Sequence, residues 1–137
     1  MTILSFDIAT RSGYAVGSTN FGLEDSGSFI CKSLIEAATT MAMLMDLWKP
    51  NIIVTAKPTR FYNTIRKQSE ITGVLLYIAE KRKIKVMKDL VDKQCKLAVL
   101  GNGNATKEDI CEKYQTQDED AADAMMFFDY ICLTIWL

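Results

Sequence analysis

Residues 2–8 read TILSFDI, a nearly continuous apolar run that carries a single carboxylate, Asp7. A run of this kind is typical of a central strand that is buried on both faces of a sheet. The turn segment TRSG follows at Thr10–Gly13, and Tyr14–Ser18 and Gly27–Cys31 then read as two further strands. The opening of the chain therefore predicts a three-stranded meander with a buried first strand.

Helical and strand patterns alternate after the meander. The segments that favour helices are Leu34–Trp48, Tyr62–Lys83, Leu90–Leu100, Lys107–Tyr114 and a last helix from Glu119, and those that favour strands are Asn51–Thr55 and Ile84–Met87. Three meandering strands followed by α/β units indicate an α/β protein with a mixed five-stranded sheet and helices on both faces. We write the expected order as β-β-β-α-β-α-β-α-α, within a single domain over residues 1–137.

The composition excludes several classes of site. Formal net charge is −1, from 16 Lys and Arg against 17 Asp and Glu, which excludes a strongly basic binder but not a local basic patch. Because the chain has no histidine, Ser-His-Asp and Cys-His catalysis and every His-ligated metal site are excluded. The four cysteines form no C-x-x-C pair, so we interpret them as packed, reduced thiols of a cytoplasmic protein.

No segment predicts a membrane partner. The N-terminus lacks a basic segment followed by an apolar core and a cleavage site. The most apolar stretch, Ala121–Leu137, contains Asp123 and Asp129 and is shorter than the roughly 20 residues that span a bilayer. We therefore expect a buried helix there.

Asp7 is the first candidate for chemistry. A carboxylate on a buried central strand requires a cation, a metal or strong hydrogen-bond donors. The alternative is that Asp7 ends the strand and caps the Thr10–Gly13 turn, since Asp is a common turn former. The local sequence leaves both interpretations open.

Asp120 and Asp123 are the second candidates. They lie three residues apart in DEDAADAMMFF, so both project from one face of the last helix and favour a shared cation. The alternative is that acidic residues in a first helical turn complement the helix dipole. That alternative explains Asp120 better than Asp123, which leads directly into the apolar run.

Two further segments favour contact with phosphates or nucleic acid. GNGNATKED at Gly101–Asp109 places a glycine-containing loop before a helix N-terminus, with Lys107 in the first turn, where a cation is unfavourable unless an anion binds. KPTRFYNTIRK at Lys57–Lys67 has no acidic residue and interleaves cations with aromatic rings, a pattern that suits a DNA-binding surface, although a solvated helix start is the alternative. Its candidate DNA-binding residues are Lys57, Arg60, Phe61, Tyr62, Arg66 and Lys67.

The candidate segments follow one another in an order that resembles that of a known family. ILSFDIATRSGYAV resembles the opening of the RuvC family of Holliday junction resolvases, GNGNATKEDI its glycine- and lysine-containing segment, and DEDAADAMMF the stretch that carries its last acidic ligands. The segment SEITGVLLYIA at Ser69–Ala79 also resembles the helix after the second acidic position of that family. The resemblance spans the chain and is strongest to the bacteriophage branch of the family.

The resemblance implies a ribonuclease-H-like fold and a homodimeric nuclease that cuts four-way junctions and other branched DNA. Asp7, Asp120 and Asp123 are then metal ligands, and Lys107 stabilises charge near the scissile phosphate. Two Mg²⁺ (or Mn²⁺) ions per active site are implied, which carboxylates and water can hold without histidine. A phage-encoded protein of this type acts in the cytoplasm of the bacterial host.

One position departs from the family pattern. The family places a Glu at the end of the fourth strand, where NIIVTAKPTR carries Ala56. Either the Glu was replaced deliberately or the chain lost it naturally. We expect one metal position to be weak or empty with Ala56, and cleavage by this chain to be weak or absent.

Three other interpretations remain. The first is a non-catalytic protein that binds branched DNA, and the second is a structural homologue without either activity. The third is an actin-like or sugar-kinase ATPase, because FDIATRSGYAV also resembles a phosphate-binding hairpin. Such ATPases duplicate this fold across two domains, whereas this sequence provides one.

Overall fold

The computed structural model of the chain describes residues 1–58 and 62–135, with side chains at all of these except residues 62–64. Its strands form one five-stranded sheet in the order β3-β2-β1-β4-β5. The strands are β1 (Thr2–Asp7), β2 (Arg11–Ser18), β3 (Gly22–Ile30), β4 (Ile52–Ala56) and β5 (Lys85–Leu90). The meander β1-β2-β3 is antiparallel, whereas β1, β4 and β5 run parallel. The sheet is therefore mixed, with the predicted first strand at its centre.

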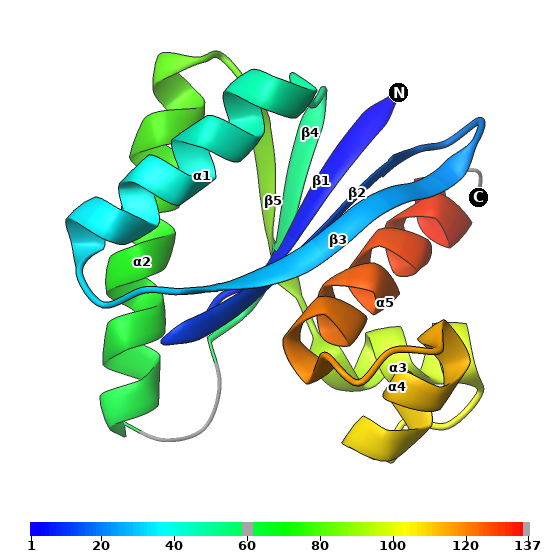
Figure 1. Cartoon of the computed structure of the whole chain (residues 1–137). Coiled ribbons are helices and arrows are strands. Elements are labelled where there is room, and N and C mark those ends of the chain that lie inside the picture. The colour runs from blue at the N-terminus through cyan, green and yellow to red at the C-terminus, as the bar shows by residue number, and fades with distance from the viewer. Residues whose placement is uncertain (59–61, 136–137) are drawn as a thin grey trace.

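Helices cover both faces of this sheet (Figure 1). They are α1 (Leu34–Trp48), α2 (Tyr62–Lys81), α3 (Asp92–Leu100), α4 (Lys107–Tyr114) and α5 (Glu119–Ile135). The first two lie on one face, and α3, α4 and α5 lie on the other. The predicted fold class is confirmed, with three helices after β5 where the expected order counts two. In the described part of the chain, none of these helices has both the length and the apolar character that crossing a bilayer requires.

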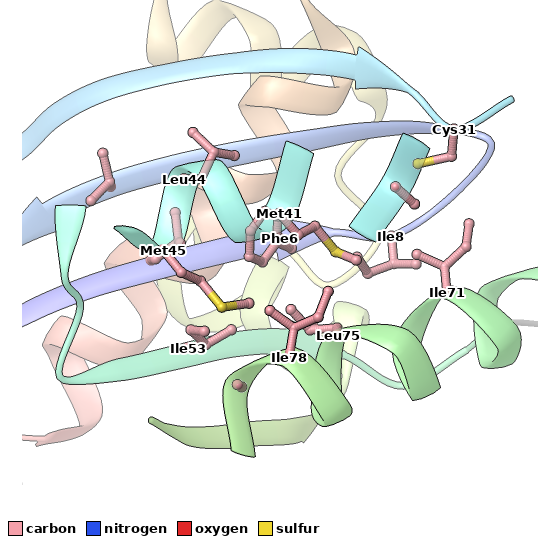
Figure 2. Close-up of a cluster of buried hydrophobic side chains, with 14 residues drawn as sticks. Phe6, Ile8, Cys31, Met41, Leu44, Met45, Ile53, Ile71, Leu75 and Ile78 are labelled. Atoms are coloured by element: carbon pink, nitrogen blue, oxygen red, sulfur yellow. The ribbon is translucent and has the colours of Figure 1, made fainter. Parts of the chain in front are cut away.

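The alternation of side chains along β1 decides which residues reach which face. Leu4 and Phe6 pack into the cluster beneath α1 and α2, together with Met41 and Leu75 (Figure 2). Ile3 packs on the opposite side, in the cluster that contains most of the buried side chains of α5. Because successive strand residues point to opposite faces, Asp7 shares the α5 face with Ile3 and Ser5.

Close contact with small residues holds α5 against the sheet. A Cβ atom at Gly13 of β2 would lie 1.9 Å from the backbone oxygen of Asp120, so only glycine fits there. The buried hydroxyl of Ser5 donates to the carbonyl of Ala124 at 2.6 Å. Ala121 and Ala122 are buried at this contact, where their small side chains let the helix lie close to the sheet. The start of α5 is therefore fixed beside the end of β1.

β2 begins at Arg11 instead of Tyr14, so most of the expected Thr10–Gly13 turn belongs to that strand. Two further strands differ from their predicted bounds by three residues or more. β3 begins at Gly22 instead of Gly27, because Glu24 and Asp25 lie on an edge strand where polar side chains reach solvent. β5 continues to Leu90, which was expected to begin a helix, and the backbone nitrogen of Lys57 donates to the Leu90 carbonyl at 2.8 Å. This second difference moves the start of α3 to Asp92 and changes the composition of the candidate site.

Candidate active site

A cavity of about 420 Å³ opens where the parallel strands β1, β4 and β5 end. Its lining comes from the last residue of β1 and the next one (Asp7, Ile8), the last residue of β4 and the next two (Ala56, Lys57, Pro58), α2 (Gln68, Thr72), α3 (Asp92, Lys96), α4 (Lys107, Ile110) and α5 (Asp123, Phe127). The carboxyl ends of parallel strands are the usual place for ligand sites in open α/β sheets. The cavity thus joins residues from the first strand and the last helix.

Asp7 and Asp123 form the centre of this cavity. The two carboxyl groups share a hydrogen bond, and burial is the largest cause that raises the pKa of Asp7 well above its usual range. Burial, followed by the charge of Asp92, raises the pKa of Asp123 to about 6, while the hydrogen bond with Asp7 opposes that rise. Two acidic groups held together in this way share a proton unless a cation replaces it.

The turn after β1 does not need Asp7. The hydroxyl of Ser12 accepts from the backbone nitrogen of Ala9 at 3.1 Å and donates to the Ala9 carbonyl at 2.7 Å. Since Ser12 closes the turn, the structure favours the chemical interpretation of Asp7 over the capping one.

Asp120 is oriented differently from Asp123. Its carboxylate pairs with Arg11 at 2.9 Å, and it does not line the cavity. Burial raises the pKa of Asp120, whereas the adjacent Arg11 lowers it. Asp120 is still close enough for its charge to raise the pKa of Asp7. Of the three predicted carboxylates, Asp7 and Asp123 therefore form a close pair, whereas Asp120 lies nearby in an ion pair with Arg11.

Three lysines border the carboxylate pair. Lys57 lines the cavity from just after β4, Lys96 from α3 and Lys107 from α4. Lys107 pairs with Glu119 at 3.4 Å while its side chain stays 68% exposed, and the charge of Glu119 is the largest cause that raises its pKa. Thr106 and Asp109 form a capping box that fixes the first turn of α4, from which Lys107 projects. The cavity thus presents cations to a bound anion around a central acidic pair.

Ala56 lies in the cavity wall at the last position of β4. It pairs across the sheet with Leu90. A side chain at position 56 therefore belongs to the same cavity as Asp7 and Asp123, where the family pattern expects a Glu.

Sequence reasoning missed Asp92. It lines the cavity from the first turn of α3 and pairs with Lys96 at 2.8 Å. The predicted helix began at Leu90, which made Asp92 an ordinary residue inside a helix. The signal that identifies it is its place two residues after a parallel strand, since the carboxyl ends of such strands meet at one edge.

The predicted DNA-binding segment is only partly described. Arg60 and Phe61 lie outside the described residues, and for Tyr62 only the backbone at the start of α2 is described. Arg66 is exposed and pairs with Glu70 at 3.3 Å, and Lys67 is half-buried. Of this segment, Lys57 is the described cation that reaches the cavity.

The donor set fits one divalent cation better than a pair of ions. Among the residues that the structure describes, no group of three or more Asp, Glu, Cys or His side chains is arranged to hold a metal ion together. The pair Asp7 and Asp123 still fits Mg²⁺, which proteins commonly bind through one or two carboxylates, with water and substrate phosphates completing the shell.

Comparison with known proteins gives a consistent set of relatives. No family model matches the chain. The chain is 27% identical over 128 aligned residues to the crossover junction endodeoxyribonuclease RuvC of Prochlorococcus marinus strain MIT 9313, covering 86% of this chain and 76% of that protein. It is 29% identical over 102 residues to the RuvC of strain SARG, covering 67% of this chain and 64% of that protein.

Solved structures of one bacterial RuvC share the fold. Thermus thermophilus RuvC superposes with a TM-score of 0.72 at 15% identity, over 97% of this chain and 96% of that chain. The same protein in complex with a Holliday junction substrate gives a TM-score of 0.71 at 12% identity, over 97% and 95% of the two chains. The ribonuclease-H-like fold expected from the resemblance is confirmed. The chain is thus similar in sequence to RuvC proteins and shares the fold of a solved RuvC structure.

Proposed function

We propose that this chain is a structure-specific endonuclease that binds four-way DNA junctions and resolves them by metal-dependent phosphodiester hydrolysis. The observation that carries the proposal is the buried Asp7–Asp123 pair in a lysine-bordered cavity. The names of the relatives support it, since they are crossover junction endodeoxyribonucleases. A structural neighbour in complex with a Holliday junction supports the choice of substrate.

The acidic and the basic residues of the cavity have different roles in this proposal. Asp7 and Asp123 bind divalent cation, and Lys57, Lys96 and Lys107 attract and orient the phosphate backbone. Bound Mg²⁺ or Mn²⁺ supplies Lewis-acid chemistry and an activated water for in-line displacement at the phosphate. Lys107 stays exposed beside the acidic pair, where it can offset negative charge that develops on the phosphate oxygens.

Ala56 removes one carboxylate from the pattern expected for two ions. With a methyl group at that position, full cleavage depends on a carboxylate from elsewhere in the cavity, and without one the second ion binds weakly. Asp120 contributes to the site only if its carboxylate leaves Arg11. Two ions per site, Asp120 as a ligand and weakened cleavage with Ala56 remain predictions.

The test compares a labelled four-way junction with linear duplex of the same sequence. We expect a gel shift with the junction in EDTA and slow symmetric nicks after Mg²⁺ is added. Asp7→Asn should abolish the nicks and keep the gel shift, because binding in EDTA does not use the metal. Comparing cleavage by the Ala56→Glu variant with cleavage by the wild type measures how much activity is lost when position 56 carries no carboxylate. Equal affinity for junction and duplex, together with no cleavage by either protein, would contradict the proposal.

A non-catalytic junction-binding protein is the alternative, and Ala56 is the observation that favours it. The two functions separate in Mg²⁺ with the Ala56→Glu variant. Cleavage by the variant identifies a nuclease site, whereas junction binding without cleavage in both proteins identifies a binding protein.

We also propose a homodimer, because two symmetric cuts require two sites related by a two-fold axis. Its support is exposed apolar surface on neighbouring helices: Ile65 and Tyr77 on α2, and Ile35, Met43 and Leu47 on α1. Other apolar residues of α2, among them Ile71 and Leu75, are buried in the core and are unavailable for the interface. Sedimentation at micromolar concentration tests the dimer, and a monomer both free and on junction DNA would contradict it. A bacteriophage source and action in a host cytoplasm remain predictions from the resemblance.

A further inference from the structure

We propose that a second hollow beside the cavity is a subsite for the nucleotide that adjoins the cut in the bound DNA strand. Lys88 contacts a phosphate of that strand, and Asp89 accepts a hydrogen bond from the amino group of the base. This inference rests on the proposed function and deepens it, because it names residues that bind the substrate outside the acidic pair.

This side hollow adjoins the cavity that holds Asp7 and Asp123. It has a volume of about 300 Å³, and Pro58 and Thr72 line both spaces. Its other lining residues come from α2 and β5: Ser69, Gly73, Leu76, Lys88 and Asp89. A DNA strand with a phosphate in the cavity can therefore extend into the side hollow with its next nucleotide.

An extra residue in β5 explains why two consecutive residues line the side hollow. Two steps along the end of β4 match three steps along β5, between Met87 and Leu90. Both of these residues pack in the cluster that contains α5 side chains, although residues three apart on a regular strand point to opposite faces. A bulge of this kind re-aims side chains, and it leaves Lys88 and Asp89 together on the side hollow.

The polar side chains of the side hollow are available to a ligand. In the part of the chain that the structure describes, Lys88 and Asp89 form no ion pair, and the hydroxyls of Ser69 and Thr72 have no hydrogen-bond partner. A lysine ammonium binds phosphate oxygens, and a carboxylate accepts from the amino group of cytosine. Hydroxyl groups can contact either the backbone or a base, so this set suits one nucleotide.

Gly73 keeps the α2 side of the side hollow open. A Cβ atom at this position would meet no other atom within 4 Å, and Leu76 adds apolar surface nearby. A base can therefore approach α2 without displacing a side chain. For the same reason, a side chain introduced at position 73 enters the side hollow without a clash.

The first test measures affinity for the labelled four-way junction in EDTA, where no metal takes part. Lys88→Gln should lower the affinity at least about threefold and reduce the slope of log affinity against log salt by about 0.9, the value for one phosphate contact. The matched control is Lys85→Gln, which changes an exposed lysine at the far end of the same strand. It should leave affinity and slope unchanged.

Two substitutions at Gly73 distinguish charge from shape. Gln and Glu are nearly equal in size, but only Glu adds a negative charge that repels a phosphate. We expect Gly73→Glu to bind the junction at least about threefold more weakly than Gly73→Gln, and thermal melts check that the two variants are equally folded. Equal junction affinity of wild type, Lys88→Gln and both Gly73 variants would overturn the subsite and leave the proposed nuclease intact.

A further test does not depend on junction recognition. Strands of four deoxycytidine or four thymidine nucleotides are titrated into the protein at low salt in EDTA, and nuclear magnetic resonance follows the backbone amides of Gly73, Lys88 and Asp89. The deoxycytidine strand should shift these resonances at an at least about threefold lower concentration, because thymine has no amino group. Asp89→Ala should remove that preference.

The titration separates failure of the subsite from failure of the proposed function. If these three amides do not shift with either strand, the side hollow does not bind a nucleotide and the inference is overturned. Equal shifts with both strands would overturn the role of Asp89. If the protein binds junction and duplex equally and does not cut, the proposed function fails, and the titration still decides whether the side hollow takes a nucleotide.

Discussion

Burial is the largest cause that raises the pKa values of both Asp7 and Asp123. Charge repulsion adds to it, from Asp123 on Asp7 and from Asp92 on Asp123. Both pKa values are raised in the folded chain, that of Asp123 to about 6, whereas an unfolded Asp titrates near 3.9. The folded state therefore holds its protons more tightly than the unfolded state between these values. Stability from this pair is fully present below about pH 4 and is lost as pH rises through about 6.

Because the ionised pair costs stability at neutral pH, we predict that Asp123→Asn stabilises the metal-free protein. At pH 7.5 in EDTA, the amide removes a buried charge, and we expect a gain of about 2 kcal/mol in the free energy of unfolding. The gain should shrink toward zero as pH falls to about 4. Urea melts of the two proteins across this range measure the difference.

The exposed carboxylate variant Asp89→Asn serves as the control, with no comparable pH-dependent gain expected. Adding Mg²⁺ at pH 7.5 should stabilise the wild type more than Asp123→Asn. Destabilisation by Asp123→Asn at pH 7.5 in EDTA would show that the charge is compensated by another group.

The contact between α5 and β2 operates at the scale of elements. Gly13 is the residue that lets the backbone of Asp120 approach the sheet, and the same approach brings Asp123 to Asp7. Gly73 in α2 offers the opposite case, because a Cβ atom there would meet nothing within 4 Å. Substituting each glycine therefore distinguishes the effect of the α5–β2 contact from the general effect of replacing a glycine.

Gly13→Ala should destabilise the fold by about 2–4 kcal/mol, because helix or strand must shift to admit the methyl group. It should also weaken Mn²⁺ binding, since the shift separates the two carboxyl groups. Gly73→Ala should be neutral or stabilising by up to about 1 kcal/mol. Thermal melts measure the stability of both variants, and titration with Mn²⁺, followed by electron paramagnetic resonance of the free ion, measures metal binding. Equal stability of Gly13→Ala and wild type would contradict the packing argument.

Strongly patterned elements could be predicted from the sequence, and element ends could not. The apolar run of β1 and the small residues of α5 favour a central strand beneath a close helix, and both are observed. The continuation of β5 to Leu90 depends on its pairing with β4, a long-range interaction that local patterns do not carry. Asp92 was missed for that reason, and the pairing of Asp120 with Arg11 also depends on tertiary contact.

At the scale of the whole molecule, charge is unevenly arranged although it nearly cancels. The net charge is −1, yet Lys57, Lys96 and Lys107 all line one cavity. DNA binding by such a protein depends on local neutralisation of phosphates. We therefore expect junction affinity to fall steeply with salt despite the acidic overall balance.

The double variant Lys57→Gln/Lys107→Gln should lower the slope of log affinity against log salt by about 2, since each phosphate contact contributes about 0.9. Lys85→Gln is the control, because Lys85 is exposed at the opposite end of β5 from the cavity. Gel-shift titrations at several salt concentrations give the slopes. An unchanged slope in the double variant would place the DNA on another surface.

The pairing of Asp7 with Asp123 also has a consequence during synthesis. The first strand leaves the ribosome before the helix that carries Asp123, and that helix must then dock on Gly13 and Ser5. Contacts between distant parts of a chain form late in folding. A chain that stops before α5 therefore has no assembled acidic pair, and under the proposed function it lacks the site that would bind metal.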